Sequence, residues 1–223
     1  MSKPKIHPSL MAAYVTALAT VFAACVAIFP KSSSSATNRT PRTETPVDQR
    51  DPNNWTPLYR AARDNNAASV QRLLEQGADP NTPDNHGLTP IFQAARRGNP
   101  QMVRTLMDKG AAVDVASDLK ETPLHYAAAS GDPETIKAIA LDKNGNPALN
   151  VNAEDIHGQR PLHYAAKQGS VDAVKLLLDL GAEDSKDDEG RAAVDLAANS
   201  KVRDAIKDAQ PKLGHGNRFK IKL

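Results

Sequence analysis

The residues of this sequence that could do chemistry begin with two histidines at matching positions, His125 and His163. Each follows Pro-Leu and precedes Tyr-Ala-Ala, and the two lie 38 residues apart. One zinc ion needs both ring nitrogens within about 2.1 Å, whereas equivalent positions on neighbouring helices lie roughly 8–10 Å apart. We therefore predict that these histidines bind no metal and that the chain holds no cofactor.

Carboxylates gather between the predicted helices and could be imagined as a general acid and base. Such a pair needs an enclosed, desolvated pocket to separate its pKa values, and no phosphate loop, nucleophile elbow or zincin motif accompanies it. Aspartate also hydrogen-bonds the backbone that follows it, which favours turns. We predict turn formation, with partner contact as the alternative, no catalysis and no small-molecule substrate; the residues are Asp84, Asp118, Glu154, Asp155, Asp187, Asp188 and Glu189.

Composition limits the other classes of function. The chain of 223 residues has 28 Lys and Arg against 26 Asp and Glu, a formal charge of +2. This charge is far smaller than the concentrated positive charge with which proteins attract nucleic acid. The single cysteine, Cys25, excludes an intramolecular disulfide and a multi-cysteine zinc site. Only 4% of the residues are aromatic, so Leu, Ile, Val and Ala must fill the core, as in closely packed helices. We predict no nucleic-acid partner.

These residues must be positioned by a repeated unit. The octets TPLYRAAR, TPIFQAAR, TPLHYAAA and RPLHYAAK begin at Thr56, Thr89, Thr122 and Arg160, with spacings of 33, 33 and 38 residues. Each contains an Ala-Ala pair and leads to a residue that tolerates a helix end, then to a good N-cap and a second run of helical periodicity. The N-caps are Asn66, Asn99, Asp132 and Ser170. The predicted unit is helix, turn, helix and extended hairpin.

This pattern resembles the ankyrin repeat, whose period is 33 residues and whose opening signature is T-P-L-H-x-A. The resemblance covers Asp51 to about Ala209. It implies an all-α solenoid of about five helix-turn-helix repeats with β-hairpin-like fingers, in which His125 and His163 close hydrogen-bonded turns. We place the repeat domain at 51–210, with repeats near 54–85, 86–118, 119–155, 156–188 and 189–209, the last one degraded as a cap.

Three departures from the pattern are specific to this chain. Lys120 stands where Gly87 and Gly158 stand, so this hairpin tip is either strained or shaped differently. Residues 143–150 lengthen the third repeat, and we expect a longer loop with the stack intact. Arg160 replaces the threonine of the opening motif, which removes one hydroxyl from the local turn.

The N-terminal region predicts membrane attachment or export. Residues 10–29 form a run of twenty residues without a charge, which as a helix would span about 30 Å, the hydrocarbon thickness of a bilayer. We interpret 1–29 as an anchor that leaves the repeat domain exported, 30–50 as a flexible linker and 211–223 as a basic tail. A cleaved signal, with cleavage near Ala36, and a lipoprotein modified at Cys25 remain alternatives.

The resemblance implies a protein that binds a partner protein, of unknown identity, through a concave face of hairpin tips and first helices. Trp55 could instead pack as a lid over the first repeat, Tyr126 and Tyr164 could be packing residues, and His86 and His157 are expected to be solvated. The alternative function is an inhibitor or immunity-type protein that neutralises a toxin or enzyme in the exported compartment. The predicted partner-binding residues are Trp55, Tyr59, Arg60, Arg63, Phe92, Arg96, Arg97, Lys120, Tyr126, Tyr164 and Lys167.

Overall fold

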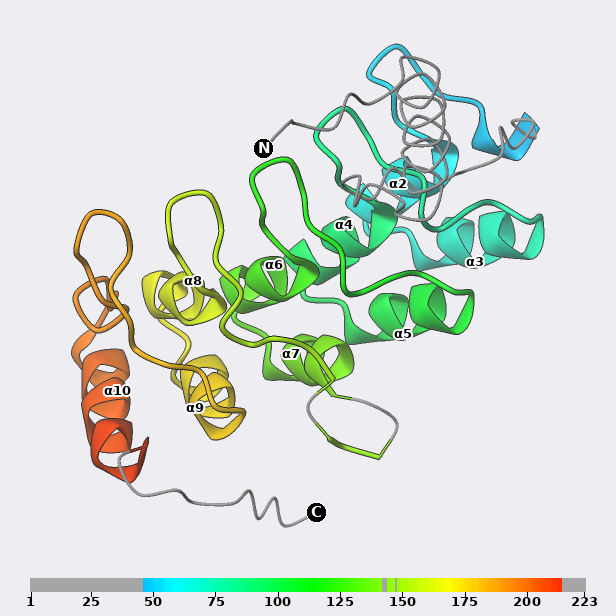
Figure 1. The fold of residues 1–223 in the computed structure, drawn as a ribbon. Coiled ribbons are helices and arrows are strands. Elements are labelled where there is room, and N and C mark those ends of the chain that lie inside the picture. Colours follow the sequence, from blue (N-terminus) through cyan, green and yellow to red (C-terminus); the bar gives the residue numbers. More distant parts are fainter. Residues whose placement is uncertain (1–45, 142–143, 147, 214–223) are drawn as a thin grey trace, which may run out of the picture. The chain divides into compact units, whose positions relative to one another are not determined.

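The structure is a computed structural model that describes residues 46–141, 144–146 and 148–213 (Figure 1). The predicted hydrophobic helix 10–29, the cleavage site near Ala36, most of the linker and residues 214–223 of the tail lie outside them. Within the described part of the chain, the structure is helical with no β-strand, and none of these helices has the length together with the hydropathy that a bilayer span requires. Its elements are η1 (Pro46–Asp48), α2 (Pro57–Arg63), α3 (Ala67–Glu75), α4 (Pro90–Arg96), α5 (Pro100–Asp108), α6 (Pro123–Ser130), α7 (Pro133–Ala140), α8 (Pro161–Gln168), α9 (Val171–Asp179) and α10 (Ser200–Leu213).

The helices of the repeat region stack in two layers. The first helices α2, α4, α6 and α8 contact one another in series, and each packs against the second helix that follows it. The connecting loops extend as fingers from the first-helix layer (Figure 1). We call the fingertips together with the exposed side of the first helices the finger face; it corresponds to the face that the resemblance describes as concave.

Local sequence signals explain where the helices begin. All four first helices start with proline at the first helical position, whose missing N–H needs no partner there. In all four second helices, the side chain of the predicted cap accepts a hydrogen bond from the backbone N–H three residues further along the chain. Asn66 Oδ1 accepts from Ser69 N at 3.0 Å, and Ser170 Oγ accepts from Ala173 N at 3.3 Å. Gly131 and Gly169 end α6 and α8 with φ of 75° and 87°, as expected of C-terminal glycines.

The core runs continuously through the repeats. The leucine or isoleucine of each opening motif is fully buried at Leu58, Ile91, Leu124 and Leu162, and the Ala-Ala pairs lie beside them at 8% exposure or less. Small side chains let adjacent first helices approach closely. Since each repeat buries its apolar residues against its neighbour, it is stable only in the stack.

The last repeat lacks its first helix. Residues 193–196 form a turn, in which the Asp195 carboxylate accepts from Ala192 N at 3.0 Å. Helix α10 then packs on α9, with Val202 and Ile206 buried. Its exposed charged residues include Lys201, Arg203, Asp204, Lys207 and Asp208. It continues to Leu213, three residues beyond the predicted end of the domain at 210.

The predicted linker extends too far. Residues 46–50 belong to the folded unit, because Val47 packs against the core, and Asp48 Oδ1 accepts from Asp79 N at 3.0 Å. Arg50 Nη1 donates to Pro83 O at 3.0 Å. The physical reason is that the first described repeat has no repeat stacked before it, so this short segment covers part of its exposed end.

The third repeat keeps its place in the stack despite its extra residues. Helix α7 ends at Ala140, Ala148 N donates to Ala140 O at 2.8 Å, and α6 packs directly on α8. Residues 144–146, the part of the loop that the structure describes, lie on the second-helix side, away from the fingers (Figure 1).

Candidate functional site: the finger face

Each fingertip is a turn closed by an acidic or hydroxyl side chain. In the second finger, Asp84 Oδ1 accepts from His86 N at 2.8 Å and from Leu88 N at 2.9 Å, while Asp84 N donates to Leu88 O at 2.9 Å. Asp155 and Asp187 repeat this geometry. The prediction that these carboxylates form turns is confirmed for the three of them.

Asp51 shows that the first finger starts three residues before the predicted repeat boundary at 54. Its Oδ1 accepts from Asn53 N and Trp55 N at 2.8 and 3.0 Å. The hydrogen bond from the Trp55 N–H is the main reason that the pKa of Asp51 lies below its ordinary value. The first repeat therefore presents a complete finger.

Lys120 adopts the same left-handed backbone as the glycines it replaces. Its φ is 58°, against 76° at Gly87 and 69° at Gly158, and its N–H donates to Ser117 O at 2.9 Å. The third fingertip thus has the common shape and carries the strain of a side chain in that conformation. Of the two alternatives left open by the sequence, strain is the one observed.

The fingers are joined into a row by backbone hydrogen bonds. Asp118 N donates to His86 O, Ile156 N to Leu119 O and Asp188 N to His157 O, each at 3.0 Å. Leu119 and Ile156 are 50% and 42% exposed, the two exposed large hydrophobic residues within the described residues. They therefore form a small apolar patch on neighbouring fingertips.

Leu119 and Ile156 were missed as site residues in the sequence. The available signal was the alignment of the fingertips, in which Leu119 stands where the second finger has His86, and Ile156 stands where it has Asn85. An apolar residue at an exposed turn has no packing role to explain it.

His125 and His163 close turns and join repeats. His125 Nδ1 accepts from Thr122 N at 3.0 Å, and its Nε2 donates to Gln159 O of the next repeat at 3.1 Å. His163 makes the same bonds with Arg160 N and Arg191 O, at 3.0 and 3.3 Å. Burial lowers the pKa of His125, which favours the neutral ring that these bonds require. The turn-closing role is confirmed.

Tyrosine and carboxylate side chains form a network on the third and fourth repeats. The Tyr164 hydroxyl lies 2.7 Å from Asp155 Oδ2 and 3.1 Å from Glu121 Oε1, and the Tyr126 hydroxyl donates to Glu121 Oε2 at 2.9 Å. Burial first, and then these carboxylates, raise the pKa of both tyrosines. We call Glu121, Tyr126, Asp155, Tyr164 and Lys167 the tyrosine half of the finger face.

Lys167 completes the tyrosine half. Its Nζ donates to Gln159 Oε1 at 2.7 Å and lies 5.7 Å from the centre of the Tyr164 ring. Gln159 Nε2 in turn donates to Asp187 Oδ2 at 2.9 Å. The polar groups of this half therefore satisfy one another.

Two predicted partner-binding residues are buried, which corrects their placement on the exposed face. Phe92 is fully buried and meets the Tyr126 ring edge-on, with ring centres 5.5 Å apart. Tyr59 is 4% exposed, and its hydroxyl accepts from Gln93 Nε2 at 2.6 Å. Tyr59 and Phe92 are equivalent in the repeat alignment to His125 and His163. Side chains at this position are buried at the contact between adjacent repeats. Their contribution to a surface is indirect.

The first two repeats carry the second group of side chains. The Arg63 guanidinium lies 4.3 Å from the centre of the Trp55 ring, and that ring stacks on Tyr59 at 5.7 Å. Arg97 Nε donates to Arg63 O at 2.7 Å, and Arg60 pairs with Asp51. Arg96 is exposed and has no hydrogen-bonding or ionic partner among the described residues. We call Trp55, Arg60, Arg63, Arg96 and Arg97 the basic half.

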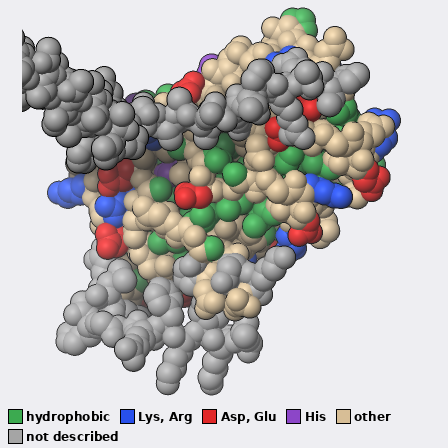
Figure 2. Space-filling view, turned by 45° about the vertical axis from the view of Figure 1, so that its right-hand side comes forward, with side chains coloured by type: hydrophobic (Ala, Val, Ile, Leu, Met, Phe, Trp, Pro, Cys, Tyr) green, Lys and Arg blue, Asp and Glu red, His purple; other side chains and the backbone are tan. Residues whose placement is uncertain are grey.

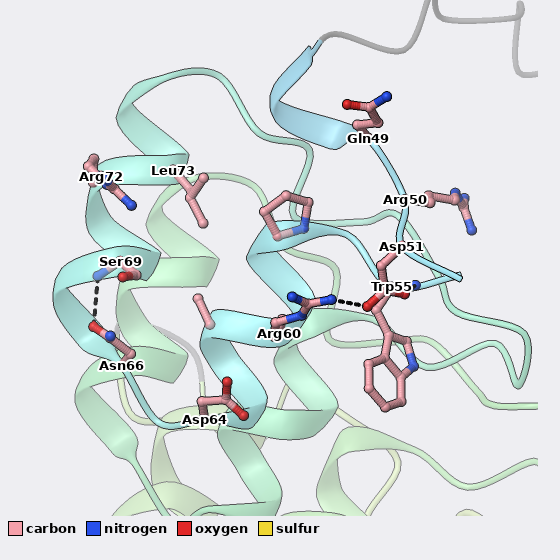
Figure 3. A pocket seen from close by; sticks show the side chains of 12 residues that line it. Gln49, Arg50, Asp51, Trp55, Arg60, Asp64, Asn66, Ser69, Arg72 and Leu73 are labelled. Atoms are coloured by element: carbon pink, nitrogen blue, oxygen red, sulfur yellow. Dashed lines mark hydrogen bonds and ion pairs between the residues drawn. The ribbon is translucent and has the colours of Figure 1, made fainter. Parts of the chain in front are cut away.

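An open groove of about 410 Å³ lies beside Trp55 at the first repeat that the structure describes (Figure 3). Pro57, Ala61 and Leu73 form its floor, and polar side chains of α2 and α3 surround them. Ser69 stands here where Met102, Thr135 and Ala173 are buried between repeats. The groove is thus the stacking side of the first repeat, made polar as a cap. Trp55 packs on Tyr59 and remains partly exposed, so its side chain has a packing role, and its role in binding stays a prediction.

Acidic and basic side chains both occur on the face that Figure 2 shows, and hydrophobic side chains reach the surface between them. Within the part of the chain that the structure describes, no group of three His, Cys, Asp or Glu side chains could hold a metal ion. The remaining predicted residue, Lys120, is exposed at the tip of the third finger.

The fold and the finger row define a stacked helical-repeat protein. The family model for ankyrin repeats, in three copies, matches residues 41–117, 58–150 and 124–207. The chain therefore belongs to the ankyrin-repeat family, whose repeats are generally non-enzymatic modules for protein interaction. A search of curated proteins gave no match.

Proposed function

We propose that this protein binds a partner protein through its finger face. The observation that carries the proposal is the pair of large apolar residues, Leu119 and Ile156, exposed on neighbouring fingertips that a backbone hydrogen bond holds together. An apolar patch that shares the finger face with arginines and a tryptophan has the composition of a protein interface. The finger row is preorganised, so binding would order few additional groups.

Site-specific photocrosslinking tests this proposal. A photoreactive amino acid placed at Leu119 or at Arg96 should capture the same partner from the protein's native source. The matched controls are Gln101 on α5 and Lys175 on α9, both exposed on second helices, and they should capture it weakly. Equal capture from the second helices would contradict binding through the finger face.

We further propose that the segment 10–29 holds the repeat domain at a membrane or directs its export, on the length of its uncharged run. Fractionation of the full-length protein, with protease added outside the membrane, tests this. Protection of the repeat domain from that protease would argue against export.

The alternative function, neutralisation of a toxin or enzyme in the exported compartment, stays a second proposal that uses the same face. It differs in strength, because an inhibitor must bind with a Kd near about 1 nM and abolish an activity of the captured partner. A partner that keeps its full activity when saturated would exclude it.

A further inference from the structure

The basic half of the finger face differs in composition from the rest of the described surface. Residues 46–213 carry 25 Asp and Glu against 20 Lys and Arg. Yet α2, α4 and the residue after α4 carry four arginines, the exposed Arg60, Arg96 and Arg97 and the half-buried Arg63. The equivalent positions of α6 and α8 hold Tyr126, Ala129 and Ser130, and Tyr164, Lys167 and Gln168. The positive charge is therefore local.

Two of the four arginines are paired with aspartates, Arg60 with Asp51 and Arg63 with Asp64, whereas Arg96 and Arg97 have no ion pair among the described residues. Arg97 is fixed by its bond to the Arg63 carbonyl, which leaves its charge uncompensated. The Arg63 guanidinium lies over the Trp55 ring, 4.3 Å from its centre, and Arg63 Nε forms an ion pair with the exposed Asp64 Oδ1 at 3.2 Å. Arg96 has neither an ionic nor a hydrogen-bonding partner among the described residues. A guanidinium ordered by stacking or by a carbonyl loses less freedom when it binds a carboxylate.

We infer that the basic half binds an acidic segment of the partner protein, with carboxylates on Arg63, Arg96 and Arg97 and Trp55 as the apolar side of the site. This inference rests on the proposed function and names its partner class. Arginine pairs with carboxylates through two parallel hydrogen bonds. A long polyanion such as nucleic acid fits less well, because it would extend from this small area over an acidic surface.

The distance between adjacent repeats determines how far apart the carboxylates of the partner segment must lie. Arg63 and Arg96 occupy equivalent positions on adjacent first helices, which lie roughly 8–10 Å apart. An extended chain rises about 3.3 Å per residue. Acidic residues three positions apart along an extended segment therefore match the two arginines.

Fluorescence anisotropy with the full chain tests the inference. The probe is a rhodamine-labelled peptide of about nine residues with two glutamates three positions apart, and its control has glutamines in their place. We expect the glutamate peptide to bind at least about tenfold more tightly, because charge-assisted bonds exceed neutral ones. Binding should weaken as salt is raised from 50 to 500 mM, since salt screens exposed charges.

The matched variants locate the site. Arg63→Gln with Arg96→Gln should reduce the affinity for the glutamate peptide about tenfold or more. Arg104→Gln with Arg203→Gln removes the same charge from exposed positions of α5 and α10 and should leave it unchanged. Thermal melting confirms that both pairs fold. Equal losses in the two variants, or no preference for glutamate over glutamine, would overturn the inference.

Two further probes distinguish a wrong assignment of the acidic segment from a wrong assignment of the finger face as the interface. A single-stranded oligonucleotide or an anionic phospholipid vesicle that binds more tightly than the glutamate peptide would overturn the acidic-peptide assignment. If crosslinking from Leu119 still captures the partner in that case, the finger face remains the interface and only its partner chemistry is wrong.

Discussion

The two halves of the finger face use the same backbone positions in opposite ways. In the tyrosine half, the Tyr164 hydroxyl donates a hydrogen bond to Asp155 and the Tyr126 hydroxyl donates one to Glu121. These polar groups are therefore satisfied inside the protein. In the basic half, Arg96 and Arg97 keep exposed guanidiniums with little internal compensation. Satisfied networks stabilise a fold, whereas exposed ordered charges are available to a partner. The comparison predicts that substitutions in the tyrosine half change stability and those in the basic half change binding.

The largest effect on stability is expected from Tyr164→Phe. The change removes the donor to Asp155 Oδ2, and Asp155 is only 5% exposed. An acceptor left unsatisfied at a buried site costs about 1–3 kcal/mol in the free energy of unfolding. Urea denaturation followed by circular dichroism measures the loss, and binding of the glutamate peptide should stay within about twofold.

Arg96→Gln is the control from the basic half. Its side chain is exposed, so its stability should stay within about 0.5 kcal/mol of the wild type. A larger loss for Arg96→Gln than for Tyr164→Phe would contradict the division of the face into these two halves.

The second prediction concerns pH and His125. Burial holds the pKa of His125 below its ordinary value of 6.5, so the unfolded chain takes up a proton first as the pH falls. The free energy of unfolding should therefore decrease as the pH drops below 6.5, by up to about 1.4 kcal/mol per pH unit, until the folded state also protonates. Denaturation at pH 7.5, 6.5 and 5.5 measures this slope.

His125→Gln tests the origin of the slope. Glutamine is an ordinary partner at this position of a capping box and does not titrate. The variant should lose the contribution of His125, so its stability should fall less steeply between pH 6.5 and 5.5. An unchanged slope would assign the pH dependence to other groups. Phe92 holds the matching position in the second repeat and does not titrate.

The third prediction uses the strained tip in the tyrosine half. Glycine adopts a φ of 58° without the side-chain penalty that Lys120 carries. After the larger entropy of glycine in the unfolded chain is subtracted, Lys120→Gly should stabilise the protein by about 0.5–1 kcal/mol. Gly158→Ala is the opposite case, because the added Cβ would lie 2.8 Å from Asp188 Oδ1, and it should destabilise. A destabilising Lys120→Gly would show that the lysine side chain makes a compensating contact.

The difference between the halves explains what the sequence could and could not reveal. The repeat period, the prolines and the N-caps act within one or two turns of chain, and Asn66 and Ser170 cap their helices as predicted. Phe92 looked like a surface aromatic because its burial depends on the next repeat, where Tyr126 covers it. Residues 46–50 looked like a linker because their partners, Asp79 and Pro83, lie about thirty residues away. Contacts between repeats are therefore the part that local patterns leave out.

The smallest expected effect compares two threonines at equivalent positions. Thr89 Oγ1, beside Phe92, is buried and has no hydrogen-bonding partner among the described residues, whereas Thr122 Oγ1 lies 2.9 Å from His125 Nδ1. Thr89→Val replaces an unsatisfied hydroxyl with a methyl group of similar shape and should change stability by less than about 0.5 kcal/mol, in the stabilising direction. Thr122→Val removes a bonded hydroxyl and should cost about 0.5–1.5 kcal/mol. The two sites differ chiefly in the ring three residues further on, which is Phe92 after Thr89 and His125 after Thr122. Equal losses of stability in the two variants would therefore mean that the hydrogen bond to His125 does not stabilise the third repeat.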